Sequence, residues 1–319
     1  MADPLHVVNA ADAAYVPHTS AMLHSLFMHN PGEELHVHFL HKATLDLALV
    51  QRLAALCRRH GARFSATPVT RAQLHDLPIG GRFPEEAWYR VVLPELLPDL
   101  PRMLWLDSDV IVRAPIRELW DLDLAGCPLA ACPNAVMFTF RHVIQDIGVA
   151  DRRKYFNSGV MLMNLDQMRA EGSLASLRAA AQRAAPAIMF ADQDVLNIVY
   201  HERYRRLHLM WNVLAQSYIN VPETIRVHGG REYEEAMRHP RIIHFTGRGR
   251  YKPWFYTCSH PHRDEYLRHR LAAGWPPPDY PDKNWRTFFA RQIPPRMREV
   301  FSTLRRRKYD EMLSYLRPW

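Results

Sequence analysis

Hydrophobic and polar positions alternate along the first hundred residues in a pattern that predicts strands and helices in turn. Buried strands are predicted at 5–10, 35–40 and 63–69. Pro17 suits the first turn of a helix between the first two strands, and 45–60 has strong helical periodicity before Gly61 ends it. Strands that alternate with helices indicate βαβ units and a largely parallel sheet.

The rest of the chain shows further patterns of both kinds. Strands are predicted at 129–132, 159–165 and 241–245, and helices at 85–97, 173–184, 192–200 and 231–238. Pro94 is expected to kink or end the first of these helices. The Pro-rich segment 275–282 interrupts regular structure. We therefore expect a main domain over 1–280 and a separate tail over 281–319.

Two carboxylates, Asp107 and Asp109, interrupt the apolar segment 102–113. Residues two apart in an extended segment point to the same side, so both carboxylates would converge at the end of a buried strand. Like charges repel each other and are costly to bury unpaired. A divalent cation such as Mg²⁺ or Mn²⁺ takes oxygen ligands and would remove that cost. The alternative for an isolated pair of acids is a solvated turn.

Further candidate residues follow the first predicted strand, lie in or after the last one, directly precede another strand or begin a predicted helix. Open α/β sheets bind ligands at the carboxyl ends of their strands. The candidate residues are Asp12, Asn157, Asp192, Gln193, Asp194, His244, Gly247 and Lys252. Ordinary structural roles are open to them as well. Asp192 could cap a helix, His244 could be a hydrogen-bonded core histidine, and Gly247 could lie in a simple turn. Taken singly, these residues leave a ligand site and a structural role open.

Six motifs, taken in order, resemble the family 8 glycosyltransferases. They are Ala10-Ala11-Asp12, Tyr89-Arg90, Leu104-Trp-Leu-Asp-Ser-Asp-Val110, Phe156-Asn-Ser-Gly-Val160, Asp192-Gln-Asp194, and His244-Phe-x-Gly247 with Lys252-Pro-Trp254. The motifs lie within residues 5–254. The resemblance implies the GT-A fold, a Rossmann-like and mostly parallel central sheet flanked by helices, with retaining transfer from a nucleotide sugar. It is greatest to bacterial galactosyl- and glucosyltransferases of lipopolysaccharide and lipo-oligosaccharide synthesis.

The resemblance also implies roles for the matching residues. Asp107, Asp109 and His244 would ligate Mn²⁺ or Mg²⁺, whose charge stabilises the departing UDP. Contacts with the UDP-sugar are implied for Ala10, Ala11, Asp12, Tyr15, Arg90, Asp107, Ser108, Asp109, Asn157, Asp192, Gln193, His244, Gly247 and Lys252. Catalytic roles are implied for Gln193, Asp192, Asn157 and Asp194.

Retention of the donor's configuration has two routes, a same-face displacement and a covalent sugar–enzyme intermediate. Gln193 is the residue that the family places near the reacting face, and a neutral amide is a poor nucleophile. Asp194 is a nearby carboxylate whose simpler role is structural. We favour same-face displacement, in which the leaving phosphate helps to deprotonate the acceptor.

The chain departs from the family pattern in three places. Ala13 and Ala14 stand where relatives often have an acid or an amide, so part of the nucleoside contact must come from elsewhere. The loop that contains Arg248 and Arg250 is longer than the tightest family spacing and suits a more anionic acceptor. Asn134 replaces an acid that some relatives use to bind the acceptor. The acceptor is therefore expected to differ.

The net charge of +8 is concentrated near the C-terminus. Residues 283–319 contain ten Lys or Arg and three Asp or Glu, so the rest of the chain is nearly neutral. Apolar spacing in the tail is close to helical, with a basic block at 305–308. We expect a basic amphipathic helical segment over 285–319 that binds an anionic membrane surface. The alternatives are docking on the main domain and nucleic-acid binding, and no recognisable nucleic-acid-binding fold accompanies the segment.

Composition agrees with a globular protein, because 48% of the residues are hydrophobic. No apolar run approaches the roughly 18–20 residues of a membrane span, and the N-terminal residues do not resemble a signal peptide. Four cysteines without close pairing are expected to be free thiols in a reducing compartment. The expected location is cytoplasmic, peripheral on the inner face of the cytoplasmic membrane.

The leading hypothesis is a metal-dependent hexosyltransferase that moves galactose or glucose from a UDP-sugar to a glycan acceptor, such as a lipopolysaccharide core or another membrane glycolipid. The alternatives are the same chemistry on a protein or soluble sugar, a nucleotidyltransferase, and a noncatalytic protein of the membrane surface. A nucleotidyltransferase would need a glycine-rich phosphate loop after the first strand, and 9–15 contains no glycine. A noncatalytic protein would be expected to have lost at least one of the motif acids, Asn157 or His244.

Overall fold

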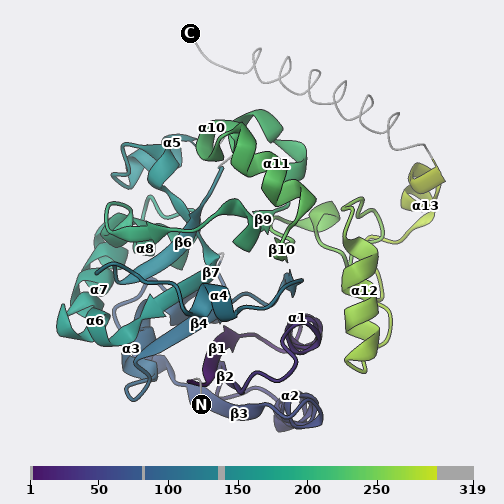
Figure 1. The fold of residues 1–319 in the computed structure, drawn as a ribbon, viewed down its shortest axis with the longest axis horizontal. Helices are drawn as coiled ribbons and strands as arrows, with labels where there is room; N and C mark the ends of the chain where they lie inside the picture. Colours follow the sequence, from purple (N-terminus) through teal and green to yellow (C-terminus); the bar gives the residue numbers. More distant parts are fainter. Residues whose placement is uncertain (1–2, 81–82, 136–140, 293–319) are drawn as a thin grey trace.

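The computed structural model describes residues 3–80, 83–135 and 141–292. Its largest sheet, within these residues, has seven strands in the order β3-β2-β1-β4-β7-β6-β8 and helices on both faces (Figure 1). The strands are β1 (Leu5–Ala10), β2 (Leu35–Lys42), β3 (Arg63–Val69), β4 (Arg102–Leu106), β6 (Leu129–Pro133), β7 (Phe156–Asn164) and β8 (Tyr204–Arg206). The α/β class predicted from the sequence is confirmed.

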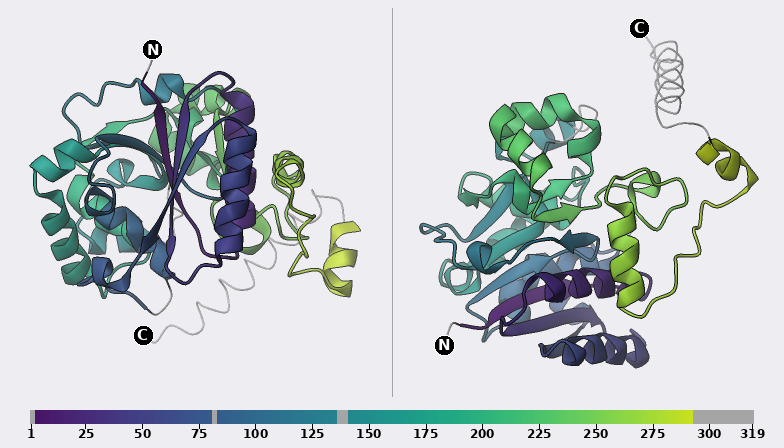
Figure 2. Two further views of the ribbon diagram at one scale, coloured as in Figure 1. Left: turned by 90° about the horizontal axis from the view of Figure 1, so that it is seen from below. Right: turned by 45° about the vertical axis from the view of Figure 1, so that its right-hand side comes forward.

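The N-terminal half of the sheet is built from the predicted βαβ units. Strand β1 pairs in parallel with β2 and β4, and β2 pairs in parallel with β3. Helices α1 (Val16–His29) and α2 (Leu47–Arg59) connect these strands and pack on one face of the sheet (Figure 2). Pro17 lies in the first turn of α1, and the Asp46 carboxylate caps α2 by accepting from Ala48 N at 2.8 Å.

Strand β7 runs antiparallel to both of its neighbours, β4 and β6. The sheet is nevertheless mostly parallel, as predicted, because the other four pairings are parallel. Reversal of β7 brings its first residues, Phe156 and Asn157, to the edge at which β1 and β4 end. Ligands bind at this carboxyl edge in open α/β sheets.

A second sheet of three short strands lies beyond the carboxyl edge. It consists of β5 (Val110–Val112), β10 (Ile242–His244) and β9 (Val213–Leu214), with β10 in the centre. The prediction that Asp107 and Asp109 share one extended strand is wrong. Strand β4 ends at Leu106, and the two acids lie in a turn through which the chain passes from the large sheet to the small one.

Three helices of the second half agree with the pattern, and most of the others were not predicted. Helices α7 (Ser173–Ala184) and α8 (Asp192–Tyr200) have the predicted bounds, and α11 (Gly230–Arg238) begins one residue early. The remaining helices are α4 (Arg117–Trp120), α5 (Arg141–Asp146), α6 (Leu165–Ala170), α9 (Gln216–Ile219), α10 (Val221–His228) and α12 (Arg263–Ala272), with 3-10 turns η1 (Arg71–Leu74), η4 (Arg152–Lys154), η5 (Leu209–Trp211) and η6 (Gly249–Tyr251).

The prediction of one continuous α-helix at 85–97 is wrong. The segment forms a 3-10 helix, η2 (Glu85–Val92), followed by a single turn, α3 (Leu93–Leu96). Pro94 explains the break, because a proline ring clashes with the carbonyl four residues earlier and prevents one continuous α-helix.

Hydrophobic side chains fill both faces of the large sheet. Alternate residues of its central strands belong to opposite cores: Leu104 packs with α1 and α2, whereas Met103 and Trp105 pack with η2, α6 and α7. Strands buried on both faces require continuous apolar runs. This is why β1 and β4 were recognisable in the sequence.

The C-terminal part of the described chain leaves the sheet. Helix α12 packs against α1, and Trp275 Nε1 donates to Ser20 Oγ at 2.9 Å. Helix α13 (Trp285–Gln292) lies away from both sheets (Figures 1 and 2). Residues 293–319 lie outside the described residues, so the amphipathic tail and the boundary near 280 stay predictions. Among the described residues, no helix is long and apolar enough to span a bilayer.

Candidate active site

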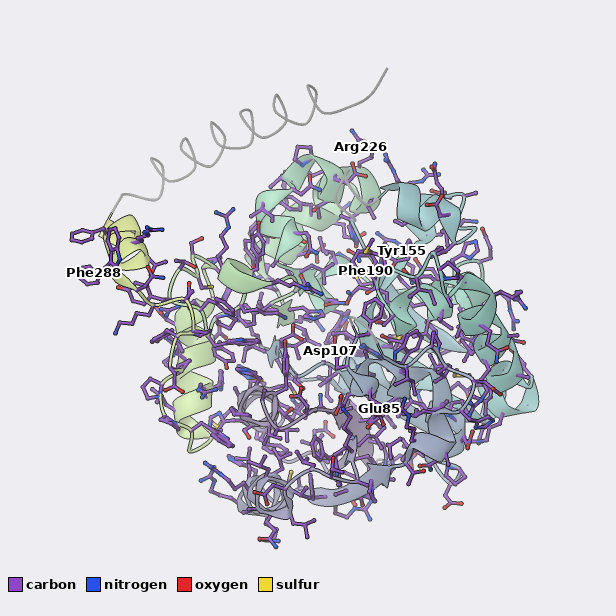
Figure 3. The ribbon with its side chains drawn as sticks, turned by 180° about the vertical axis from the view of Figure 1, so that it is seen from behind. Glu85, Asp107, Tyr155, Phe190, Arg226 and Phe288 are labelled. Atoms are coloured by element: carbon purple, nitrogen blue, oxygen red, sulfur yellow. The ribbon has the colours of Figure 1, made fainter. Side chains whose placement is uncertain are left out.

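The turn between β4 and β5 is anchored beneath the carboxyl edge. Asp107 N donates to Gly159 O of β7 at 2.8 Å. The Ser108 hydroxyl faces inward and lies 2.8 Å from Thr19 Oγ1 on α1. Ser108 is therefore buried under the turn. The side chains of Asp107 and Asp109, on either side of it, face the carboxyl edge of the sheet. Figure 3 labels Asp107 near the middle of the molecule.

His244 reaches this turn through backbone pairing of the small sheet. Strand β10 is antiparallel to β5, with His244 opposite Val110, and Phe245 N donates to Asp109 O at 2.9 Å. His244 Nε2 lies 3.3 Å from Asp109 Oδ1 and 3.7 Å from Asp107 Oδ2. The three side chains offer ligand atoms that all lie within 4.8 Å of one another. The predicted grouping of these residues is therefore present in the structure.

Gly159 provides the space in which the three side chains meet. A Cβ on this residue would lie 2.2 Å from His244 Cε1 and 2.7 Å from Asp107 Oδ2. Two carboxylates and one imidazole are a coherent set for a divalent cation. The donor set thus fits a metal ion, and the lack of a side chain at Gly159 allows His244 and Asp107 to approach each other.

Charged partners contact both acids. Lys252 forms an ion pair with Asp109, and Arg90 Nη1 donates to Asp107 Oδ1 at 2.6 Å. Burial by itself raises the pKa of Asp109, but the charge of Lys252, with a further contribution from His244, outweighs burial and brings this pKa well below its usual range. Burial also opposes the charge of Lys252, and Asp109 outweighs it, so the pKa of Lys252 is raised.

Arg90 connects the turn to the start of α8. Its guanidinium pairs with Asp192, and Nη2 donates to Asp192 Oδ1 at 3.0 Å while Nη1 donates to Ser158 O at 3.1 Å. Burial raises the pKa of Asp192 to about 7 despite the pairing with Arg90. The residue before the helix, Ala191, has a φ of 48°, a strained conformation that turns Asp192 and Gln193 toward the site.

A chain of buried hydrogen bonds connects His244 to Asp194 through four neutral side chains. In order, these are Asn212, Asn157, Gln193 and Tyr155. The donor–acceptor distances along the chain are 3.0, 2.9, 2.9, 2.8 and 2.6 Å. Asp194 also accepts from Met189 N at 2.7 Å and Phe190 N at 2.9 Å. Its carboxylate therefore takes part in structural hydrogen bonds behind Gln193.

Backbone donors determine the direction of this chain. Gly159 N donates to Asn157 Oδ1 at 3.0 Å and Ser158 N donates to Gln193 Oε1 at 3.2 Å, so the atoms facing them are oxygens. Asn212 must then donate through Nδ2 to Asn157 Oδ1, and its own Oδ1 accepts from His244 Nδ1. His244 therefore donates through Nδ1, and its Nε2 faces the two acids.

A pocket of about 260 Å³ opens beside the acids. Its lining residues are Ala10, Ala11, Asp12, Tyr15, Pro84, Glu86, Ala87, Arg90, Trp105, Asp107, Ser108 and Asp109. Eight of these twelve were predicted to contact the UDP-sugar. Asp12 Oδ1 accepts from Tyr15 N at 2.9 Å and so shapes the turn that begins α1.

The segment after β10 forms the opposite side of the site. Gly247 has a φ of 91°, and a Cβ there would lie 3.1 Å from the Tyr251 ring. Lys252 follows the turn η6 and reaches Asp109, as described above. Arg248 and Arg250 lie near the surface of this loop. The loop therefore places a buried cation beside the acids and two more outside.

Several residues of the site were not predicted. Asn212 and Tyr155 complete the hydrogen-bond chain, and Trp105 Nε1 donates to Asp107 Oδ1 at 2.8 Å. Tyr155 directly precedes a recognised motif and could have been included with it. Asn212 has no such signal, because it follows a 3-10 turn between two short elements.

Comparisons with known proteins agree with the geometry. Over 279 residues the chain is 28% identical to general stress protein A of Bacillus subtilis. The matched region covers 85% of this chain and 94% of that protein. It is 23% identical to a lipopolysaccharide 1,3-galactosyltransferase of Salmonella typhimurium, over 86% of this chain and 80% of that enzyme. The crystal structure of the galactosyltransferase LgtC with donor and acceptor sugar analogues superposes with a TM-score of 0.73 at 24% identity, covering 86% and 98% of the two chains.

The superposition shows that the chain has the GT-A fold expected from the motifs. A family model described as "Glycosyl transferase family 8" matches residues 6–258. This range contains every candidate site residue described above and, apart from Leu5, both sheets. The chain therefore belongs to glycosyl transferase family 8.

Proposed function

We propose that the protein is a metal-dependent, retaining hexosyltransferase that moves galactose or glucose from a UDP-sugar to a glycan acceptor. The observation that supports this most directly is the position of the Asp107, Asp109 and His244 group beside the pocket at the carboxyl edge. A nucleotide sugar needs both a place for its nucleoside and a cation for its diphosphate. The two features are adjacent in this chain.

The three grouped side chains are the proposed ligands of Mn²⁺ or Mg²⁺. When bound, such an ion supplies Lewis-acid stabilisation of the charge that develops on UDP. Lys252 is proposed to exchange its contact with Asp109 for the diphosphate, since a cation at this carboxylate would replace its charge. The positive φ of Gly247 lets the backbone approach the phosphates closely.

The donor sugar is proposed to lie against Arg90, Asn157, Asp192 and Gln193. Both functional atoms of the Gln193 amide are already hydrogen-bonded, and the Asp194 oxygens accept from Tyr155 and the backbone. These bonds leave neither side chain available as a nucleophile without rearrangement. They support same-face displacement, with the two side chains as positioning groups.

The acceptor is proposed to be a membrane glycolipid such as a lipopolysaccharide core. Support comes from the name of the Salmonella relative, from the basic composition of the tail, and from the exposed aromatic residues of α13. Trp285, Phe288 and Phe289 of this helix are 69%, 46% and 64% exposed. Aromatic residues beside basic ones suit an anionic bilayer surface, so we place the enzyme peripherally on the inner face of the cytoplasmic membrane.

A panel of UDP-sugars, incubated with enzyme and Mn²⁺ and scored by mass spectrometry for donor hydrolysis, tests the donor and the metal together. We expect hydrolysis of UDP-galactose or UDP-glucose that EDTA abolishes. Asp109→Asn should lack it, whereas Asp264→Asn, at a carboxylate 82% exposed on α12, should retain it. Full activity after chelation would refute the metal dependence.

The acceptor needs a second assay, with detergent-solubilised lipo-oligosaccharide compared with soluble sugars and proteins. Transfer to the glycolipid is the expected result. Transfer confined to soluble sugars or proteins would overturn the proposed acceptor and leave the proposed donor chemistry intact.

A further inference from the structure

Three histidines gather on the large sheet, near the amino ends of its strands. His6 lies on β1 and is paired in register with His36 on the neighbouring strand β2. His38 follows His36 by two residues, so its side chain projects from the same face of the sheet. Parallel pairing and the two-residue spacing therefore bring three imidazoles to one place.

The nitrogens of these rings face one another at short range. His6 Nδ1 lies 2.9 Å from His38 Nε2, and one nitrogen from each of the three rings lies within 4.8 Å of the others. The His6 ring centroid is 5.4 Å from that of His36 and 5.2 Å from that of His38. His36 Nε2 lies 2.7 Å from the Ser65 hydroxyl on β3, which leaves Nδ1 of this ring available.

The protonation of the cluster suits metal binding. Burial lowers the pKa of all three imidazoles, and that of His38 falls to about 3. Arg63 lowers these pKa values further, and Glu34, which lies 3.6 Å from the Arg63 guanidinium, opposes it at His6 and His36. Neutral imidazole is the form that ligates metals.

We propose that His6, His36 and His38 form a binding site for a divalent transition-metal ion, with Zn²⁺ as its expected occupant. Three imidazoles with a fourth position for water are an established zinc donor set. Imidazole also prefers Zn²⁺ to Mg²⁺, which takes oxygen ligands. The ion would take the place of the proton that lies between His6 Nδ1 and His38 Nε2. That proton would move to the other nitrogen of the ring that carries it, so that both rings stay neutral.

The contact between His6 and His38 requires only a small adjustment. With Zn–N bonds of about 2.0–2.1 Å and tetrahedral angles, two ligand nitrogens lie about 3.4 Å apart. His6 and His38 would separate by about 0.5 Å from their present contact to reach that distance. His6 and His36 are half-buried. The His36 and His38 rings are stacked with their centroids 4.0 Å apart, so ligation would also require one of them to tilt.

This site is separate from the proposed active site. His6 precedes Ala10, a pocket residue, by four positions on the same strand, which corresponds to about 13 Å along β1. An ion bound there would connect β1 and β2 at their amino ends, far from the acids. We expect it to stabilise the sheet without taking part in sugar transfer.

Equilibrium competition with a chromophoric chelator tests the proposal on the full-length protein. Zn²⁺ affinity should fall by about 100-fold or more in His38→Gln and in His36→Gln, because even partners outside the ligand set contribute 10- to 100-fold. His24→Gln is the matched control. His24 Nδ1 also lies 2.9 Å from another imidazole, His269 Nδ1, but this pair belongs to no three-ligand group in the described part of the chain.

Asp109→Asn separates the two metal sites. Retention of the tight Zn²⁺ site in this variant, together with X-ray absorption showing three imidazole ligands, is the expected result. Loss of that site in Asp109→Asn, or unchanged Zn²⁺ affinity in His36→Gln and His38→Gln, would overturn the proposal. His36→Gln serves as the second variant if His38→Gln does not fold, since His36 is the more exposed of the two.

Discussion

Gly159→Ala changes the proposed metal site by a single methyl group. The added Cβ would lie 2.2 Å from His244 Cε1, whereas non-bonded carbons are stable at about 3.5–4.0 Å. The imidazole would have to retreat by at least about 1.3 Å. Ligand distances tolerate errors of only about 0.2 Å, so His244 would leave the coordination sphere. We expect Mn²⁺ affinity to fall by about 100-fold or more.

The same methyl group should also destabilise the fold. Overpacking a well-packed site costs about 1–3 kcal/mol of unfolding free energy. Gly159 lies within β7, where the neighbouring strand β4 limits relaxation of the backbone. A 100-fold loss in metal affinity corresponds to about 2.7 kcal/mol, so the two losses should be of similar size and must be measured separately.

Electron paramagnetic resonance measures free Mn²⁺ in titrations of the purified protein, and urea denaturation gives the stability. The matched control is Gly230→Ala at the start of α11, where an added Cβ meets no atom within 4 Å and φ is unstrained. This control should bind Mn²⁺ like the wild type. Wild-type Mn²⁺ affinity, to within about threefold, in folded Gly159→Ala would refute the ligand assignment.

Two further predictions concern the hydrogen bonds of His244 and the pH dependence of stability. Asn212→Leu removes the acceptor for His244 Nδ1–H, so we expect Mn²⁺ affinity to fall by about 10- to 100-fold. The ¹⁵N spectrum of His244 should then show mixed tautomers. A single unchanged tautomer would contradict this prediction. Burial raises the pKa of Glu232, but hydrogen bonds from His228 and Arg206 outweigh it and lower the pKa to about 2, below the ordinary 4.5. The stabilisation is therefore present above pH 4.5 and is lost as the pH falls toward 2. Glu232→Gln should be less stable than the wild type by about 1–2 kcal/mol at pH 7, and the difference in unfolding free energy should be smaller at pH 3. Urea denaturation at the two pH values measures this difference.

Periodic apolar patterns were enough to predict most of the large sheet. Strands β1 and β3 and helices α7 and α8 have the bounds that periodicity indicates. Strand β9 has two residues and β8 has three, which is too short for any period to be recognised. These elements exist because tertiary pairing with β10 and β6 stabilises them, and no local pattern records such pairing.

The candidate site was predictable where it follows the carboxyl edge of the sheet. Asp12 and Asp107 follow parallel strands, so their convergence needs no knowledge of distant contacts. Asn157 reaches the same edge only because β7 is reversed, a fact that its apolar pattern does not contain. His244 was placed by family resemblance, and the pairing of β10 with β5 supplies the physical reason.

The hydrogen-bond chain from His244 to Asp194 has only one arrangement in which every member has a partner. Reversal of the Asn157 amide would direct its NH₂ group at the Gly159 amide hydrogen and leave buried groups unpaired, at about 1–3 kcal/mol for each group. The same holds for Gln193, whose oxygen accepts from Ser158 N. The tautomer of His244 and the orientation of Gln193 are therefore linked through Asn212 and Asn157. Because preorganised groups need no reorientation during the reaction, this linkage explains why an amide, rather than a carboxylate, suits the position that we propose faces the donor sugar.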